Sequence, residues 1–122
     1  MAIIGIGTDL VEVARIKAFA QKPGALARIF SPEEIDYCLS RKNKYEHLAV
    51  RFAAKEAVFK ALPFDGIAFK KITVVNLGSG RPQVRVQDKR AAHLNIFISL
   101  SHTRHYATAQ VVIEPCNSSR RK

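Results

Sequence analysis

The order of hydrophobic and polar positions divides the chain into segments typical of strands and of helices. Residues 2–8 are apolar and glycine-rich without interruption, which predicts a buried strand. Thr8 or Asp9 is suited to cap a following helix, because short polar side chains accept hydrogen bonds from free backbone N–H groups. We therefore expect a strand-to-helix junction at these two residues and a helix over residues 10–21.

Two further helices are expected before the middle of the chain. The SPEE sequence at residues 31–34 is typical of a helix start, with serine at the N-cap, proline at the first helical position and glutamate completing a capping box. We expect this helix to run to about Leu39. A longer helix is predicted over residues 45–62, where Pro63 stops it.

The second half of the chain has the pattern of strands. Four strands are expected, at residues 71–77, 83–87, 95–101 and 106–113. The turn segment GSGRP between the first two predicts a hairpin, and Asp88 is expected to cap a short helix that ends at about His93. Short links between consecutive strands favour an antiparallel or mixed sheet. The sequence therefore predicts a single α+β domain in which that sheet packs with the long central helix.

Composition supports one folded domain. The 122 residues are 48% hydrophobic and 25% charged, which is ordinary for a globular protein. We expect the domain to span residues 1–116 and a basic, disordered tail to occupy residues 117–122. No apolar run approaches a membrane span and the start lacks the features of a signal peptide, so a cytoplasmic location is expected. Cys38 and Cys116 lack the spacing of a zinc site.

The net charge is the first indication of function. The sum of 20 lysines and arginines against 10 acidic residues is +10, which favours an acidic or phosphorylated partner. A small nucleic-acid-binding module is one interpretation, although the sequence has no helix-turn-helix pattern and no strand-borne aromatic cluster. A protein-interaction domain without catalysis is another.

The segment GIGTD contains the first candidate functional residue, Asp9. The segment resembles part of a dinucleotide-binding fingerprint, but the third glycine and the alternating βαβ pattern are missing. Asp9 is expected where a buried strand becomes a helix, a position that holds functional groups rigidly. The alternative is an ordinary N-cap aspartate.

The segment RFAAKEAVFKAL in the long helix contains the second candidate, the pair Glu56 and Lys60. With about 100° of rotation per residue, an apolar stripe forms the core face of this helix. Its members are Val50, Ala54, Ala57, Val58 and Ala61. Glu56 and Lys60 lie away from that stripe, and the small residues Ala49 and Ala53 are expected to leave room for a ligand. The alternative is a solvated ion pair that contributes only about 0.3–0.5 kcal/mol to helix stability.

His102 is the third candidate. Strand alternation puts it at the end of an apolar row with Ile96, Ile98 and Leu100. The alternative is an ordinary turn histidine. A Ser-His hydrolase is poorly supported, because Ser101 and His102 point to opposite faces of the strand and no nucleophile elbow is present.

Asp9 and Glu56 are the acids that would form a metal site. Mg²⁺ typically takes one or two protein carboxylates, and waters and phosphate oxygens complete its shell. Lys60 and several arginines would add positive charge for a pyrophosphate group. The combination therefore favours a phosphorylated substrate over a bare metal site.

Four segments, in order, resemble the motifs of the holo-[acyl-carrier-protein] synthases, which are 4′-phosphopantetheinyl transferases. They are GIGTDLVE with Arg15-Ile16, RFAAKEAVFKAL, Gly80-Arg81-Pro82 and the SLSH sequence that ends at His102. The resemblance covers nearly the whole chain and implies the fold of that family. It also implies transfer of the phosphopantetheine arm from coenzyme A to a serine of apo acyl carrier protein. The by-product would be adenosine 3′,5′-bisphosphate, and the reaction would support fatty acid biosynthesis.

The resemblance implies roles for individual residues. Asp9 and Glu56 correspond to the acids that bind Mg²⁺, and Lys60 completes the catalytic set beside the reacting phosphate. Glu56 or a metal-bound hydroxide would take the serine proton. Residues expected to bind the substrates are Arg15, Arg51, Lys60, Gly80, Pro82 and His102. Arg15 would dock the acidic carrier protein, and the family is usually a homotrimer that binds coenzyme A between subunits. No membrane or nucleic-acid partner is expected.

Overall fold

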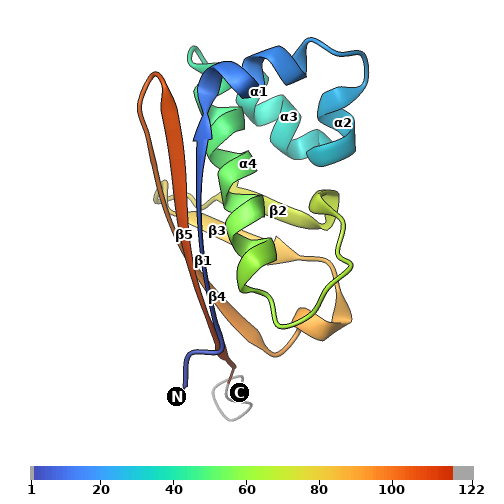
Figure 1. The fold of residues 1–122 in the computed structure, drawn as a ribbon, viewed down its shortest axis with the longest axis vertical. Helices are drawn as coiled ribbons and strands as arrows, with labels where there is room; N and C mark the ends of the chain where they lie inside the picture. Colours follow the sequence, from blue (N-terminus) through green and yellow to red (C-terminus); the bar gives the residue numbers. More distant parts are fainter. Residues whose placement is uncertain (1, 117–122) are drawn as a thin grey trace.

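The computed structural model describes residues 2–116, and the basic tail expected at residues 117–122 lies outside the described residues. Its centre is the helix α4 (Lys44–Ala61), which lies along a three-stranded antiparallel sheet (Figure 1). In spatial order the strands of that sheet are β1 (Gly5–Glu12), β5 (Tyr106–Pro115) and β4 (Leu94–His102). The predicted α+β class, the antiparallel sheet and the long central helix are confirmed.

The remaining elements cover other sides of α4. Three short helices gather near its N-terminal half, at the top of Figure 1: α1 (Val13–Ala20), α2 (Ala25–Ile29) and α3 (Pro32–Leu39). The predicted hairpin forms a separate two-stranded sheet of β2 (Ile72–Asn76) and β3 (Pro82–Val86). Two 3₁₀ turns precede β2 and β4: η1 (Phe69–Lys71) and η2 (Lys89–Ala91). No helix within residues 2–116 is long and apolar enough to cross a membrane.

Several predicted boundaries are confirmed by hydrogen bonds. The Ser31 hydroxyl accepts from the Glu34 N–H at 3.2 Å, and the Glu34 carboxylate accepts from the Ser31 N–H at 3.0 Å, which completes the capping box of α3. The helix α4 ends just before Pro63. The Asp88 carboxylate accepts from the Arg90 N–H at 2.9 Å and caps η2.

The start of the chain differs from the prediction. The strand β1 continues to Glu12, and Asp9 lies within it, opposite Ala109 of β5, rather than at a strand-to-helix junction. The helix α1 starts at Val13, so neither Thr8 nor Asp9 caps it. Backbone pairing with β5 extends to the end of β1 and outweighs the capping preference of two short polar residues. The helix α2 lies in a segment for which no element was predicted.

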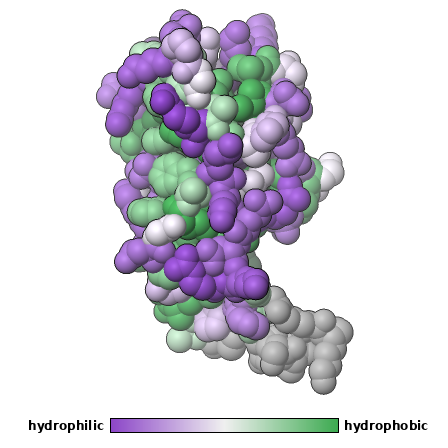
Figure 2. All heavy atoms as spheres, turned by 90° about the vertical axis from the view of Figure 1, so that its right-hand side faces the viewer, coloured by the Kyte–Doolittle hydropathy of each residue, from purple (hydrophilic) through white to green (hydrophobic). Residues whose placement is uncertain are grey.

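The strand β1 is buried on one face only, so the expectation of a fully buried strand is wrong. Ile6 and Leu10 on its outer face are 71% and 68% exposed. Val112 of β5 and Phe97 of β4 are exposed in the same cross-strand row as Ile6. The outer face of the sheet therefore carries an exposed apolar row, followed by the polar row of Thr8, Gln110 and Ser99. On the side of the molecule away from the sheet, hydrophilic residues are interspersed with hydrophobic ones (Figure 2).

Gly5 and Gly7 allow β1 and α4 to approach closely. A Cβ atom added to Gly5 would lie 1.9 Å from the carbonyl oxygen of Ala61, and one added to Gly7 would lie 2.0 Å from that of Ala57. Both distances are far below van der Waals contact, so only glycine fits at these two positions. The next residue in the same row of β1 is Asp9, which this packing brings beside the helix.

A buried ion pair connects α4 to α3. Lys55 Nζ lies 2.7 Å from Glu34 Oε1, and both side chains are fully buried. The ammonium also donates to the carbonyls of Phe69 (3.0 Å) and Ile72, and the second Glu34 oxygen accepts from the Val74 N–H at 2.9 Å. Burial lowers the pKa of Lys55, and the Glu34 carboxylate opposes that shift. Because all three N–H donors of Lys55 have acceptors, the pair joins α4 firmly to α3, η1 and β2.

Candidate functional site

Three of the predicted site residues meet where α4 passes the edge strand β1. Lys60 Nζ donates to the Asp9 carboxylate (Nζ–Oδ1 3.2 Å) and to the Thr8 carbonyl (3.1 Å). Glu56 lies one helical turn before Lys60 on the same flank of α4. The Lys60 side chain is 51% exposed and that of Asp9 is 15% exposed, so a mostly buried carboxylate faces an accessible ammonium. We refer to Asp9, Glu56 and Lys60 as the edge cluster.

The charges of the edge cluster act on one another. Partial burial raises the pKa of Glu56, and the neighbouring negative charge of Asp9 raises it further. Lys60 and Arg15 of α1 oppose that rise, which puts the exposed Arg15 side chain within electrostatic reach of the cluster. Two carboxylates that repel each other form a site that an added cation would stabilise.

The donor set of the edge cluster fits a magnesium ion that takes its other ligands from water and substrate. Asp9 and Glu56 offer the hard carboxylate oxygens that Mg²⁺ prefers, and the ion commonly uses only one or two of them. Within residues 2–116, no group of three or more His, Cys, Asp or Glu side chains could hold a metal ion. A magnesium ion in the edge cluster would therefore take its remaining oxygen ligands from water or from a phosphate-bearing substrate.

Ala49 and Ala53 do not leave room for a ligand, contrary to the prediction from helical spacing. Both are fully buried in the hydrophobic core. Because the glycines of β1 bring its backbone against this side of α4, the small side chains serve close packing instead. The open side of the edge cluster is the side of Lys60 and Arg15.

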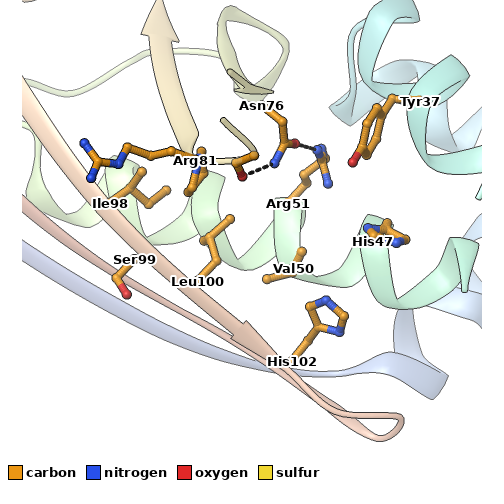
Figure 3. Close-up of a pocket in the computed structure, with 12 residues that line it drawn as sticks. Tyr37, His47, Val50, Arg51, Asn76, Arg81, Ile98, Ser99, Leu100 and His102 are labelled. Atoms are coloured by element: carbon orange, nitrogen blue, oxygen red, sulfur yellow. Dashed lines mark hydrogen bonds between the residues drawn. The ribbon is translucent and has the colours of Figure 1, made fainter. Parts of the chain in front are cut away.

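A second group of predicted residues lines a pocket between α4, β4 and the turn of the β2–β3 hairpin (Figure 3). The pocket has a volume of about 400 Å³. The predicted substrate-binding residues that line it are Arg51, Gly80, Pro82 and His102. Its other polar lining residues are Tyr37, His47, Asn76, Arg81 and Ser99. We refer to this cavity as the basic pocket.

Arg51 is held in one orientation at the back of the basic pocket. Its side chain is buried and donates to Asn76 Oδ1, and Asn76 Nδ2 in turn donates to the Gly80 carbonyl at 3.1 Å (Figure 3). The guanidinium carbon lies 4.4 Å from the centre of the Tyr37 ring, within the range of a cation–π interaction. Arg51 Nε has no hydrogen-bond partner among the described residues. A buried, oriented guanidinium of this kind is suited to bind an anion.

Two histidines form one wall of the basic pocket. His102 ends β4, and its Nδ1 lies 2.9 Å from Glu46 Oε1 at the start of α4. The His47 ring meets the His102 ring at a centroid distance of 5.6 Å. Burial lowers the pKa of His47, and the positive charge of Arg51 lowers it further. His47 therefore favours the neutral form, and Arg51 and Arg81 are the permanent cations of the pocket lining.

The edge cluster and the basic pocket lie on opposite flanks of α4. Residues Arg51 and Glu56 are separated by about 140° around the helix, since each residue turns by about 100°. Asp9 on β1 and Leu100 on β4 both pair with Ala109 of β5, so one strand stands between the two groups. The structure thus brings the predicted catalytic residues together. It also brings the predicted substrate-binding residues together, except that Arg15 and Lys60 lie with the first group.

Sequence reasoning missed three residues that shape the basic pocket. Tyr37 and Asn76 hold Arg51 from α3 and β2, and no local pattern relates those elements to α4. His47 could have been found, because it stands four residues before Arg51 and shares its helix face.

Comparison with known proteins assigns this fold to a family. The family model for the 4′-phosphopantetheinyl transferase superfamily matches residues 5–111. The chain belongs to this superfamily. Among members of the superfamily, the holo-[acyl-carrier-protein] synthase of Geobacter sp. (strain M21) is 43% identical over 92% of this chain and 98% of the relative. That of Chlamydia muridarum (strain MoPn / Nigg) is 42% identical over 97% of this chain and 100% of the relative.

Solved structures of the transferase superfamily agree with the fold. A holo-(acyl-carrier-protein) synthase from Bacillus anthracis, in complex with CoA (3′,5′-ADP), has a TM-score of 0.81 and 34% identity, over 93% of this chain and 97% of that one. The Helicobacter pylori enzyme in complex with coenzyme A has a TM-score of 0.79 and 31% identity, over 89% of this chain and 99% of that one. The family and the fold implied by the sequence motifs are confirmed.

Proposed function

We propose that this chain is a holo-[acyl-carrier-protein] synthase. It transfers the 4′-phosphopantetheine arm of coenzyme A to a serine of apo acyl carrier protein and releases adenosine 3′,5′-bisphosphate. The observation that carries the proposal is the combination of two acids with a lysine and a cationic pocket, in a chain similar over nearly its whole length to such synthases. The reaction would support fatty acid biosynthesis, and the cytoplasmic location stays a prediction.

The reaction depends on positioning and charge neutralisation more than on covalent catalysis. The serine oxygen forms a bond to the phosphorus that bears pantetheine, and the bond from that phosphorus to the bridging oxygen breaks. Adenosine 3′,5′-bisphosphate leaves with the bridging oxygen. Glu56 is our candidate to accept the serine proton, because its carboxylate belongs to the edge cluster, where the reacting phosphate would lie.

The edge cluster would stabilise charge in this step. Asp9 and Glu56 would hold Mg²⁺, which when bound supplies neutralisation of the pyrophosphate charge. Lys60 would bind the phosphate oxygens as negative charge moves toward the leaving group. Its exposed ammonium can reach a substrate while the hydrogen bond to Asp9 keeps its position.

The basic pocket would bind the nucleotide end of coenzyme A, which carries three phosphate groups. Arg51 offers a fixed guanidinium for a phosphate, and His102 offers a second polar group across the pocket. Gly80 and Pro82 shape the turn that closes the pocket, and the Gly80 carbonyl orients Asn76. The volume of about 400 Å³ is sufficient for part of this ligand, in the range typical of small-molecule sites.

Assembly as a homotrimer would join the two groups of residues. The edge cluster borders β1 and the basic pocket borders β4, at opposite edges of one sheet. A head-to-tail contact that pairs one edge with the other edge of the next copy closes into a ring. The exposed row of Ile6, Val112 and Phe97 supplies apolar surface for such an interface.

Arg15 would meet the acidic carrier protein. It is exposed on α1 and lies within electrostatic reach of Glu56, so a protein bound there would present its serine to the edge cluster. Long-range attraction of this kind accelerates encounter and weakens as salt is added.

One assay tests the proposal. The protein is incubated with apo acyl carrier protein, coenzyme A and Mg²⁺, and the intact mass of the carrier is measured. The expected result is a phosphopantetheine adduct that requires Mg²⁺ and is absent with the Glu56→Gln variant. Salt-sensitive RNA binding without any adduct would contradict the proposal and favour the alternative, a small basic nucleic-acid-binding module.

A further inference from the structure

We propose that Glu46 is a positioning residue that fixes His102 with its Nε2 atom directed to the basic pocket. The role of this pocket as the coenzyme A site rests on the proposed function. Neither the sequence motifs nor the comparisons assign a role to Glu46. The inference rests on its contact with His102 and on its place outside the pocket wall.

The two residues face each other from α4 and β4. Glu46 lies in the first turn of α4, and Val50, four residues later on the same helix face, lines the basic pocket. His102 and Leu100 form the matching row on β4. The Nδ1 to Oε1 distance is 2.9 Å, and the side chains are only 32% (His102) and 18% (Glu46) exposed. The contact is therefore partly shielded from water, which favours a defined geometry.

The chemistry of the pair determines which ring nitrogen faces the ligand. A carboxylate only accepts hydrogen bonds, so Nδ1 of His102 must carry the proton that it donates to Glu46. Nε2 is then the nitrogen left for the pocket, where it accepts in the neutral ring and donates in the imidazolium form. The edge-on contact with His47 at 5.6 Å restricts rotation of the same ring from the other side.

Glu46 acts through His102 rather than on the ligand. It is not among the residues that line the basic pocket, whereas His102 and Arg51 are. A carboxylate inside the pocket would repel phosphate, but behind His102 it only orients the ring. Asn76, which itself lines the pocket, likewise offers a side-chain oxygen that accepts from Arg51, so an oxygen acceptor orients each of the two groups.

The protonated nitrogen of His102 can be measured directly. Nitrogen-15 NMR of the free protein at pH 8.5, where an ordinary imidazole is neutral, distinguishes the two tautomers, and loss of the signal in His102→Asn identifies the residue. The native protein and Glu46→Gln, whose amide oxygen still accepts, should show the proton on Nδ1. Glu46→Ala should move it to Nε2. Asp36→Ala, which removes an exposed carboxylate elsewhere on the surface, is the matched control and should leave the signal unchanged.

Coenzyme A binding supplies the second measurement. Calorimetry should show binding about fivefold weaker for Glu46→Ala, near native for Glu46→Gln and native for Asp36→Ala. In turnover the KM for coenzyme A should rise while the KM for carrier protein stays constant. The proposal is overturned if native His102 carries its proton on Nε2, or if Glu46→Ala binds coenzyme A as the native protein does. Failure of the native protein to bind coenzyme A would instead contradict the proposed function, and the NMR result would still decide the role of Glu46.

Discussion

Lys60 Nζ on α4 lies 3.2 Å from Asp9 Oδ1 on β1, so an ammonium occupies part of the space around the carboxylate that we propose as a metal ligand. The Lys60 ammonium and a Mg²⁺ ion would compete for the Asp9 carboxylate. Lys60→Met should therefore bind Mg²⁺ more tightly, by about two- to fivefold in the absence of coenzyme A. The same variant should transfer phosphopantetheine poorly, since it loses a group that binds phosphate. Calorimetry with Mg²⁺ tests the expected tighter binding, and a turnover assay tests the expected loss of transfer. Weaker Mg²⁺ binding by Lys60→Met would mean that Lys60 orients Asp9 rather than competes for it.

Glu56 should lower the stability of the metal-free protein at neutral pH. Burial and the charge of Asp9 raise its pKa, so the folded state favours the protonated form. Below the ordinary glutamate pKa, Glu56 is protonated in both states and the folded state keeps its full stability. That stability is lost as pH rises through the raised pKa of the folded state, because Glu56 then ionises beside Asp9. Glu56→Gln should therefore have a higher Tm than the native protein at pH 7 in EDTA, while its turnover falls by roughly 100-fold or more.

The control for that variant is its own pH dependence. The difference in Tm between native protein and Glu56→Gln should shrink as pH falls toward 4, because native Glu56 then becomes neutral as well. A difference that stays constant from pH 4 to pH 7 would show that packing, not charge, produces it.

Gly7→Ala should disrupt the contact between β1 and α4. The added Cβ would lie 2.0 Å from the Ala57 carbonyl oxygen, so strand and helix must separate. We expect a loss of about 1–3 kcal/mol in the free energy of unfolding and a larger proportional loss of turnover, because Asp9 moves with the strand. Urea unfolding and the transfer assay measure both. Gly78→Ala is the control, since no atom lies within 4 Å of its added Cβ, and it should behave like the native protein.

Arg15→Glu should act on carrier protein rather than on coenzyme A. The reversal of charge places like charges against an acidic partner, so the KM for carrier protein should rise by about tenfold or more. The KM for coenzyme A should change little. Lys89→Glu makes the same change in net charge at an exposed site in η2 and should leave both constants near native. An unchanged carrier KM for Arg15→Glu would remove Arg15 from the docking surface.

Phe97→Asp should prevent assembly without unfolding the chain. Phe97 is 54% exposed on the outer face of the sheet, and a charge there would have to be buried in the proposed trimer. Light scattering should report a monomer, circular dichroism a native-like fold, and the assay a loss of turnover. Leu39→Asp, on the surface of α3, is the matched control. A native chain that is fully active as a monomer would refute the trimer.

Mixing two impaired variants, one in each group of residues, tests whether a site is shared between copies. Glu56→Gln retains the basic pocket, and His102→Ala retains the edge cluster. If the edge cluster of one copy works with the basic pocket of another, mixed trimers contain some intact sites and part of the activity returns. Absence of any recovery, with exchange of subunits demonstrated, would mean that each copy uses its own residues.

Local signals account for most of the elements that the sequence predicted correctly. The capping box at Ser31, the stop at Pro63 and the turn of the β2–β3 hairpin each depend on a few adjacent residues. The strand-to-helix junction predicted at Asp9 was wrong because the end of the strand depends on residues distant in sequence. Its strand is extended by pairing with β5, nearly one hundred residues later, and propensity is a weak guide where distant strands pair.

The candidate site divides in the same way. Sequence motifs named Asp9, Glu56, Lys60 and His102, and the structure brings the first three together. These three residues and His102 lie on different sides of α4. That arrangement follows from the order of the strands in the sheet, which no local motif predicts. The contacts made by Glu46 to His102 likewise join elements distant in sequence, so only the folded chain reveals them.

The closeness of Gly5 and Gly7 to the carbonyls of α4 bears on how such a chain can diverge. The spacing between β1 and α4 is set by peptide groups in contact and not by the sizes of side chains. Exchanges among core aliphatic residues elsewhere can therefore lower or raise stability without altering the separation of the two proposed metal ligands. Core residues can therefore change while the two proposed metal ligands, Asp9 and Glu56, keep their separation. Gly5 and Gly7, in contrast, admit no other amino acid.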